Sequence, residues 1–127
     1  MSNDNKLVTI KFSVIVSTDI IPPVFTYINS ENFDTNGSVT TYVGEETHII
    51  YTLKDRNLSF TDPAITNNFN GDISYLITTE KYNNDTLTII DNGNDAEVVG
   101  LQLIIKNSST GQLYASPDPQ IISKRRG

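Results

Sequence analysis

The sequence predicts an all-β protein, an antiparallel β-sandwich of eight or nine short strands. Two observations carry this prediction. Apolar and polar residues alternate with a period of two in one segment after another. Turn-forming residues separate these segments at intervals of about 8 to 12 residues, which is typical of sandwiches and barrels. No segment repeats its apolar residues at helical spacing for about three turns, so no helix is expected.

The clearest alternation opens the chain and predicts a strand over residues 7–18. Every second residue from Val8 to Val16 is apolar, and polar residues such as Thr9 and Lys11 lie between them. Successive side chains of a strand point to opposite faces, so one face of this strand should be buried. A Pro-Pro pair then interrupts ladder pairing, and residues 24–28 resume an extended run.

The middle of the chain predicts a hairpin turn and a central strand. Asn36-Gly37 supplies the positive φ angles of a tight turn, so residues 38–43 should fold back on a preceding segment. Residues 47–53 form the next strand, and both of its faces are partly apolar. One face carries Thr47, Ile49, Tyr51 and Leu53, and the other carries His48, Ile50 and Thr52. A strand with two apolar faces is expected at the centre of a sheet.

The second half continues with short strands and polar turns. A short strand over residues 58–60 precedes a polar loop over residues 61–71, which contains Asp62-Pro63. Further strands are expected over residues 73–81, 87–90, 98–106, 113–116 and 120–123, with Val99, Leu101, Leu103 and Ile105 pointing inward. Pro117 and Pro119 hold Asp118 extended and deny two backbone donors, which would blunt a sheet edge.

Several strands carry neighbouring apolar residues where strict alternation would place a polar one. Examples are Ile49-Ile50, Ile89-Ile90 and Leu103-Ile104-Ile105. Such doubling is expected where both faces of a strand find cover or where a strand meets a subunit partner. We therefore expect a second covered surface in addition to the core.

Length and composition indicate a single soluble domain over residues 1–127, with flexible ends at about residues 1–5 and 124–127. The chain is 37% hydrophobic and 19% charged, and no apolar run approaches the roughly 20 residues that a membrane-spanning helix needs. It has no cysteine, which excludes disulfides and thiolate metal sites. The polar start lacks the features of a secretion signal, so we expect a cytoplasmic protein.

Charge argues against nucleic acid as a partner. The formal net charge is −6, and three of the cations, Lys124, Arg125 and Arg126, lie within the last four residues. The remaining surface is more acidic still and would repel phosphates. The basic tail could hold the protein at an anionic surface or an acidic neighbour, but a solvated, frayed terminus is the favoured interpretation.

Catalytic and metal-binding signals are few. His48 is the only histidine, and Glu45 and Glu46 precede it closely enough to orient it. No Gly-x-Ser-x-Gly motif accompanies it, so a sheet residue is favoured over a catalytic one. Asp91-Asn92-Gly93-Asn94-Asp95 holds four oxygen-bearing side chains that could bind calcium, but the same residues form ordinary turns, which we favour.

Other functional sites have still less support. Paired carboxylates could meet in space, although nothing nominates a pair. Glycine-rich nucleotide loops are missing from the sequence, and we expect no cofactor. Tyr51 and Tyr75 could contribute to a sugar-binding surface, but both fall in phase with core positions, so a core role is favoured.

Two segments resemble known families. Gly44-Glu45-Glu46-Thr47-His48-Ile49-Ile50-Tyr51-Thr52-Leu53 is similar to the second strand of many bacterial immunoglobulin-like domains. The segment from Gly111 to Ile122, with its Pro117-Asp118-Pro119 element, resembles the end of the small bacterial DP-EP family and, more faintly, of PixA-type inclusion-body proteins. The chain has no Glu-Pro pair. The resemblance implies an immunoglobulin-like β-sandwich without a catalytic residue to transfer.

Two hypotheses about function follow. The favoured one is a non-enzymatic binding or assembly module that self-associates through a sheet face or an edge strand. The alternative is a small hydrolase or carbohydrate-active domain that uses His48 or a carboxylate pair.

Overall fold

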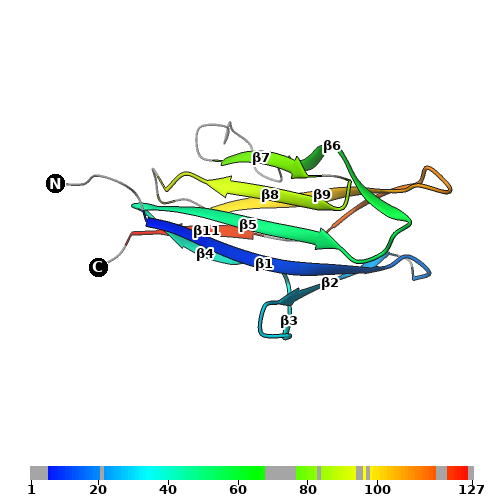
Figure 1. The fold of residues 1–127 in the computed structure, drawn as a ribbon, viewed down its shortest axis with the longest axis horizontal. Coiled ribbons are helices and arrows are strands. Elements are labelled where there is room, and N and C mark those ends of the chain that lie inside the picture. Colours follow the sequence, from blue (N-terminus) through cyan, green and yellow to red (C-terminus); the bar gives the residue numbers. More distant parts are fainter. Residues whose placement is uncertain are drawn as a thin grey trace.

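The chain folds as eleven β-strands in the computed structural model, which describes residues 6–20, 22–67, 77–82, 84–93, 96, 98–116 and 120–125 (Figure 1). The strands are β1 (Lys6–Ser17), β2 (Val24–Asn29), β3 (Asp34–Thr35), β4 (Val39–Tyr42), β5 (Glu45–Leu53), β6 (Leu58–Asn67), β7 (Ile77–Tyr82), β8 (Thr86–Asp91), β9 (Val98–Asn107), β10 (Leu113–Ala115) and β11 (Gln120–Lys124). The all-β class is confirmed. The described residues contain more strands than the expected eight or nine. Ten of the eleven overlap expected ranges, and β3, which is only two residues long and shows no alternation, was not expected.

The strands form two sheets that share one apolar core. The first sheet has the order β3-β2-β1-β5-β8-β7. The second has the order β10-β9-β11-β4, and β6 also pairs with β9. Buried residues from both sheets make up the core, among them Phe12, Tyr51, Ile89, Leu101 and Ile105. The inner faces therefore pack against each other, while the immunoglobulin-like connectivity stays a prediction.

Two of the described strand pairs are parallel, so the predicted antiparallel pairing is wrong for these two pairs. β1 runs parallel to β5 from the pair Lys6–Glu45 to the pair Val14–Leu53, and β4 runs parallel to β11. Alternation specifies which face of a strand is buried, but the same pattern serves either strand direction. The sequence therefore could not reveal the direction of these pairs.

The predicted alternation is confirmed in β1 and β5. Phe12, Val14 and Val16 are buried on the inner side of β1. Buried and half-buried residues alternate along the whole of β5, which lies between β1 and β8. Tyr51 is completely buried, as predicted, and its ring stacks on Phe12 with 5.4 Å between ring centroids. β5 is thus a central strand of the first sheet.

The hairpin expected at Asn36-Gly37 was wrong. Gly37 does have a positive φ of 79°, but β4, which follows it, pairs with β11 in the second sheet. A β-carbon at Gly37 would lie only 2.8 Å from the ring of Tyr27, and the Gly37 carbonyl accepts a hydrogen bond from the Tyr51 hydroxyl at 2.9 Å. The turn is therefore packed against the core and carries the chain from one sheet to the other.

The polar loop expected over residues 61–71 was also wrong as far as residue 67. β6 extends through Asn67, and its register against β9 shifts between Phe60 and Ile65. This irregularity contains Pro63, whose missing N–H is tolerated at bulges and in edge strands. Residues 68–71 of the expected loop lie outside the described residues.

The later strands agree with the sequence. β8, β9, β10 and β11 coincide with predicted strands to within a residue or two, and Leu101, Leu103 and Ile105 are buried as expected. β11 includes Lys124, where a frayed end was expected. The doubled residues Ile50, Ile90 and Ile104 are half-buried. Tyr75, the side chain of Val99 and the Pro117-Asp118-Pro119 element lie outside the described part of the structure.

Candidate functional site

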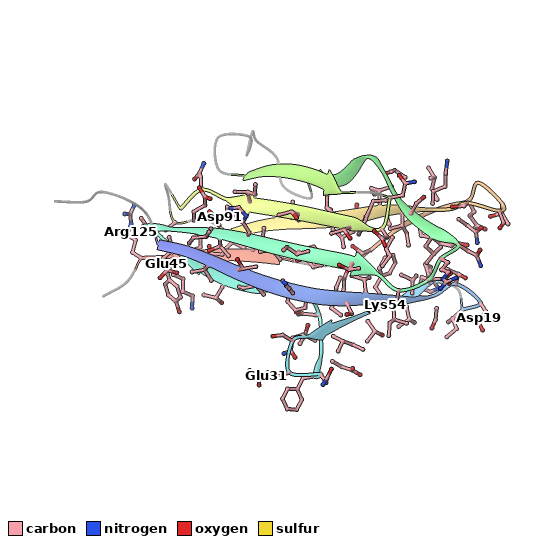
Figure 2. All side chains as sticks on the ribbon, in the orientation of Figure 1. Asp19, Glu31, Glu45, Lys54, Asp91 and Arg125 are labelled. Carbon is pink, nitrogen blue, oxygen red and sulfur yellow. The ribbon has the colours of Figure 1, made fainter. Side chains whose placement is uncertain are left out.

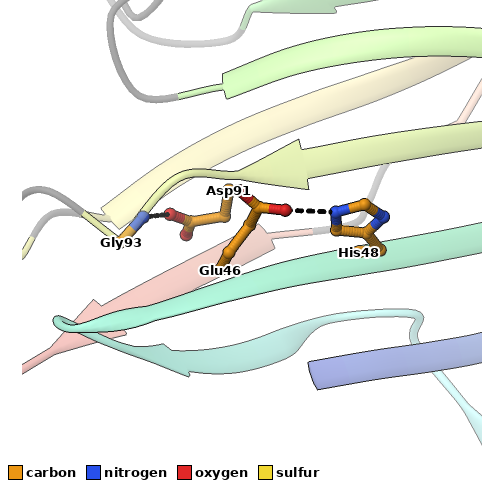
Figure 3. Close-up of polar contacts among 4 residues, drawn as sticks. All are labelled: Glu46, His48, Asp91 and Gly93. Atoms are coloured by element: carbon orange, nitrogen blue, oxygen red, sulfur yellow. Dashed lines mark hydrogen bonds and ion pairs between the residues drawn. The ribbon is translucent and has the colours of Figure 1, made fainter. Parts of the chain in front are cut away.

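His48 lies on the outer face of the first sheet and pairs with one glutamate. Its Nε2 is 2.7 Å from Oε2 of Glu46, and 29% of the histidine side chain is exposed (Figure 3). The two residues are two positions apart on β5 and therefore share its outer face. Glu45 lies on the opposite, inner side and is buried. The strand thus supplies the histidine with one of the two expected acidic neighbours.

The register around His48 determines what this pair could do chemically. Thr9 of β1 and Ile90 of β8 flank His48 in the sheet. A carboxylate orients an imidazole, which general acid–base chemistry requires. A catalytic group also needs a concave site for substrate. The two cavities of the described structure whose linings are given below are formed by other residues.

Asp91, the first residue of the predicted calcium loop, is buried in a polar network. Its Oδ1 accepts a hydrogen bond from the Gly93 backbone N–H at 2.9 Å (Figure 3), and its Oδ2 accepts one from Thr41 Oγ1 at 2.8 Å. Ser123 Oγ lies 2.8 Å from Thr41 Oγ1. Gly93 has a φ of 74°, so residues 91–93 form a turn stabilised by an Asx side chain, as favoured from the sequence.

This network is better suited to joining strands than to binding a metal. Both carboxylate oxygens of Asp91 already accept hydrogen bonds from the protein. Among the described residues, no group of three or more His, Asp or Glu side chains could hold a metal ion. Asn94 and Asp95, the end of the predicted loop, lie outside the described residues.

A first cavity, which we call the β5–β6 cavity, brings two carboxylates together at one end of the sandwich. Its volume is about 590 Å³, and its lining includes Lys54, Asp55, Arg56 and Asp85. Asp55 Oδ1 accepts a hydrogen bond from the Asn57 N–H, and Asp85 Oδ1 accepts one from the Thr86 hydroxyl. Both aspartates are exposed. The sequence named neither, because the two turns that bring them to one cavity are remote in the chain.

A second cavity, the β10 cavity, has a more apolar wall. Its volume is about 340 Å³, and it lies between the β1–β2 turn and β10. Its lining residues are Thr18, Ile20, Pro23, Gln112, Leu113, Tyr114 and Ala115. Ile20 and Leu113 are large apolar residues with exposed fractions of 51% and 61%. Apolar groups thus line a cavity and also face solvent beside it.

The pairing of β10 within its sheet explains why no described strand covers this cavity. β10 and β11 pair with successive parts of β9. Between them, Ser116 continues the ladder, because its N–H donates to the Leu103 carbonyl and its Oγ accepts from the Leu103 N–H. Among the described strands, β10 pairs only with β9. Its other edge therefore lies beside the β1–β2 turn without a strand partner in the described structure.

The sequence pattern of the DP-EP family matches residues 8–125. The chain belongs to the DP-EP family. This membership confirms the resemblance seen at the C-terminal end of the sequence. Among curated proteins, none matches the sequence. The described residues also contain no helix with the length and apolar character that a bilayer crossing requires.

A solved structure supports the fold of this DP-EP protein. It is the crystal structure of an inclusion body protein, PixA, from Burkholderia cenocepacia J2315. The two chains share 10% sequence identity, and the TM-score is 0.53. The match covers 97% of this chain and 99% of the PixA chain. At this identity the likeness establishes a shared fold over the full length of both chains.

Proposed function

We propose that this DP-EP protein is a non-enzymatic assembly module that acts in the cytoplasm and associates with copies of itself through a sheet face or an edge strand. One observation carries the proposal. Large apolar side chains of the described residues remain 43% to 63% exposed at seven positions: Leu7, Ile15, Ile20, Val24, Phe33, Val98 and Leu113. Covering this apolar surface with a second copy would remove it from water. Its burial would stabilise the complex by about 25 cal/mol per Å² of apolar surface.

The arrangement of these residues adds to the proposal. Single exposed apolar residues are ordinary on protein surfaces, whereas clustered ones mark interaction sites. Ile20 and Leu113 line the same cavity, although 93 positions separate them in the sequence. Ile15 and Val24 lie on the neighbouring strands β1 and β2, in register positions two residues apart. Four of the seven exposed apolar residues therefore lie around the β1–β2 turn and β10.

The structural neighbour supports the same interpretation. PixA is named an inclusion body protein, and its fold extends over nearly the whole of this chain. That name is consistent with a protein that associates with copies of itself. By analogy, we assign an assembly role to the DP-EP protein.

Sedimentation velocity on the purified protein tests the proposal. At concentrations from about 1 µM to several hundred µM, we expect the weight-average mass to rise above that of the 14.1 kDa chain. The rise should depend reversibly on concentration. A single monomeric species over the whole range contradicts the proposed function.

The β5–β6 cavity favours a second candidate function, a carbohydrate-active domain. Asp55 and Asp85 line one open cavity, as paired carboxylates of glycosidases do. Titration with a panel of oligosaccharides, followed by NMR, should then shift amide signals of residues 54–59 and 84–86. The variants Asp55→Asn and Asp85→Asn should abolish the shifts, whereas His48→Gln should not. No shift at millimolar sugar would exclude this candidate and leave the assembly proposal untouched.

A further inference from the structure

Phe33 is the most exposed large apolar residue of the described chain. Its exposed fraction is 63%, and it lies in the turn between β2 and β3. We call residues 24–35 the Phe33 hairpin. The hairpin projects from the body of the sandwich, with Glu31 labelled near its tip (Figures 1 and 2). An aromatic ring in this position adds little to the core of its own chain, but aromatic rings often dominate binding interfaces.

Hydrogen bonds to a single residue hold the backbone of the turn that carries the ring. Asn29 Oδ1 accepts hydrogen bonds from the N–H groups of Glu31 and Phe33, both at 3.0 Å. The Asn29 N–H donates to the Phe33 carbonyl, and the Asn29 carbonyl accepts from the Asn32 N–H. Asn32 has a φ of 67°, a conformation that asparagine tolerates better than most residues. Because the turn is already ordered, binding through Phe33 costs little conformational entropy.

The β10 cavity is large enough to accept this ring. A cavity of about 150 Å³ is sufficient to hold benzene, and the β10 cavity measures about 340 Å³. Ile20, Pro23 and Leu113 supply apolar walls. The ring cannot come from the same molecule, because Phe33 is exposed and the extended strand β2 separates it from Pro23 by roughly 17 Å along the chain.

Charges around the two surfaces are partly complementary. Glu31 and Asp34 are exposed on either side of Phe33. Lys106 is exposed and lies directly opposite Leu113 in the β9–β10 pair, so the two side chains share one face of the sheet. The acidic hairpin of one molecule would therefore meet a cation beside the cavity of the next. Asp19, on the β1–β2 turn, is exposed near Ile20 and would oppose the hairpin.

We propose that Phe33 of one molecule inserts into the β10 cavity of a second copy, between Ile20 and Leu113. The two surfaces are different parts of the chain, so each molecule keeps one of them free after pairing, and the contact repeats head to tail. This inference rests on the proposed assembly function and names the surfaces that would carry it.

Two single variants and their mixture test the proposal by sedimentation velocity. Phe33→Ala removes the ring and leaves the cavity, whereas Leu113→Glu places a carboxylate at the cavity and leaves the ring. Each variant alone should be monomeric, with association weakened at least about thirtyfold. An equimolar mixture should form a one-to-one dimer and nothing longer, because it contains one intact hairpin-to-cavity contact. Thr9→Glu, which adds a carboxylate at an exposed site on β1 outside both surfaces, should assemble like the wild type.

The charged residues give a second, independent measurement. Lys106→Glu should weaken association several-fold, and Asp19→Asn should tighten it, with both effects reduced at 0.5 M salt. If Phe33→Ala and Leu113→Glu both assemble like the wild type, this inference is wrong while self-association stands through another surface. Chains longer than dimers in the mixture would also overturn it. A wild-type protein that is monomeric at every concentration would refute the assembly function itself.

Discussion

Thr41 Oγ1 donates a hydrogen bond to Asp91 Oδ2 over 2.8 Å, and this bond joins the two sheets. Thr41 lies on β4 of the second sheet and Asp91 on β8 of the first. Because the single Thr41 proton is directed at Asp91, Ser123 Oγ must donate its own proton to Thr41. A serine, a threonine and an aspartate thus form a directed chain inside the protein, in which the carboxylate is the final acceptor.

Removing the Asp91 carboxylate should destabilise the protein strongly. In Asp91→Ala, the Thr41 hydroxyl and the Gly93 N–H both lose their acceptor in a buried environment. We expect a loss of about 2–4 kcal/mol in the free energy of unfolding, measured with urea. Asp55→Ala is a matched control, because Asp55 also accepts an N–H two residues ahead, but at an exposed position. The control should lose less than about 1 kcal/mol, and equal losses would contradict the role of burial.

Two glycines with positive φ should respond very differently to alanine. Gly93 and Gly44 have φ values of 74° and 92°, which cost an alanine about 1–2 kcal/mol at either site. A β-carbon at Gly93 would also overlap the Glu45 carbonyl oxygen, whereas one at Gly44 would meet nothing within 4 Å. Gly93→Ala should therefore lower the midpoint of thermal unfolding far more than Gly44→Ala, or prevent folding. Similar midpoints would show that the chain relaxes at Gly93.

The sequence correctly predicted the strands in which the polarity of each residue indicates whether it is buried. The alternation in β1 and β5 identified their buried faces because each side chain reports its own exposure through its polarity. Strand direction and the choice of sheet depend on partners that are distant in the chain. For this reason a positive φ was correctly predicted at Gly37, although Asn36 has none, and the Asn36-Gly37 turn joins two sheets where a hairpin was expected.

The candidate assembly surfaces could not be found by the same reasoning. Phe33 lies in a segment without clear alternation, and the β10 cavity is built from the β1–β2 turn and a strand near the C-terminus. Whether an apolar residue is exposed depends on how the chain folds. The residue type alone predicts burial and therefore does not reveal the exposed cases. A weak signal was present, since Asn29 to Asn32 is a polar stretch that ends on a phenylalanine.

Replacing Thr47 by valine should leave the protein as stable as before or make it more stable. Thr47 is buried on β5, opposite Asp91 of β8, and its Oγ1 has no hydrogen-bond partner among the described residues. Valine has nearly the same shape, removes the unsatisfied hydroxyl and is favoured in strands. We expect the free energy of unfolding, measured with urea, to change by between zero and about +1 kcal/mol. A loss above about 1 kcal/mol would indicate that the hydroxyl binds an ordered water molecule.

The Tyr51 hydroxyl should make the fold sensitive to alkali. Burial, with a smaller contribution from the nearby Tyr27, raises the pKa of Tyr51 well above the ordinary tyrosine value near 10. The folded chain therefore keeps a proton that the unfolded chain loses above about pH 10. Because ionisation then favours the unfolded state, the contribution to stability is complete below pH 10 and falls as the pH rises further.

The variant Tyr51→Phe removes the titratable hydroxyl but keeps the packing of the ring. The variant loses the hydrogen bond to the Gly37 carbonyl and should be about 1 kcal/mol less stable at neutral pH. Since phenylalanine has no proton to lose, the free energy of unfolding of the variant should fall less steeply above pH 10 than that of the wild type. The two slopes should differ by up to about 1.4 kcal/mol per pH unit. The two curves of unfolding free energy against pH should therefore converge in alkali. Parallel curves between pH 9 and 12 would show that Tyr51 does not carry the alkaline sensitivity.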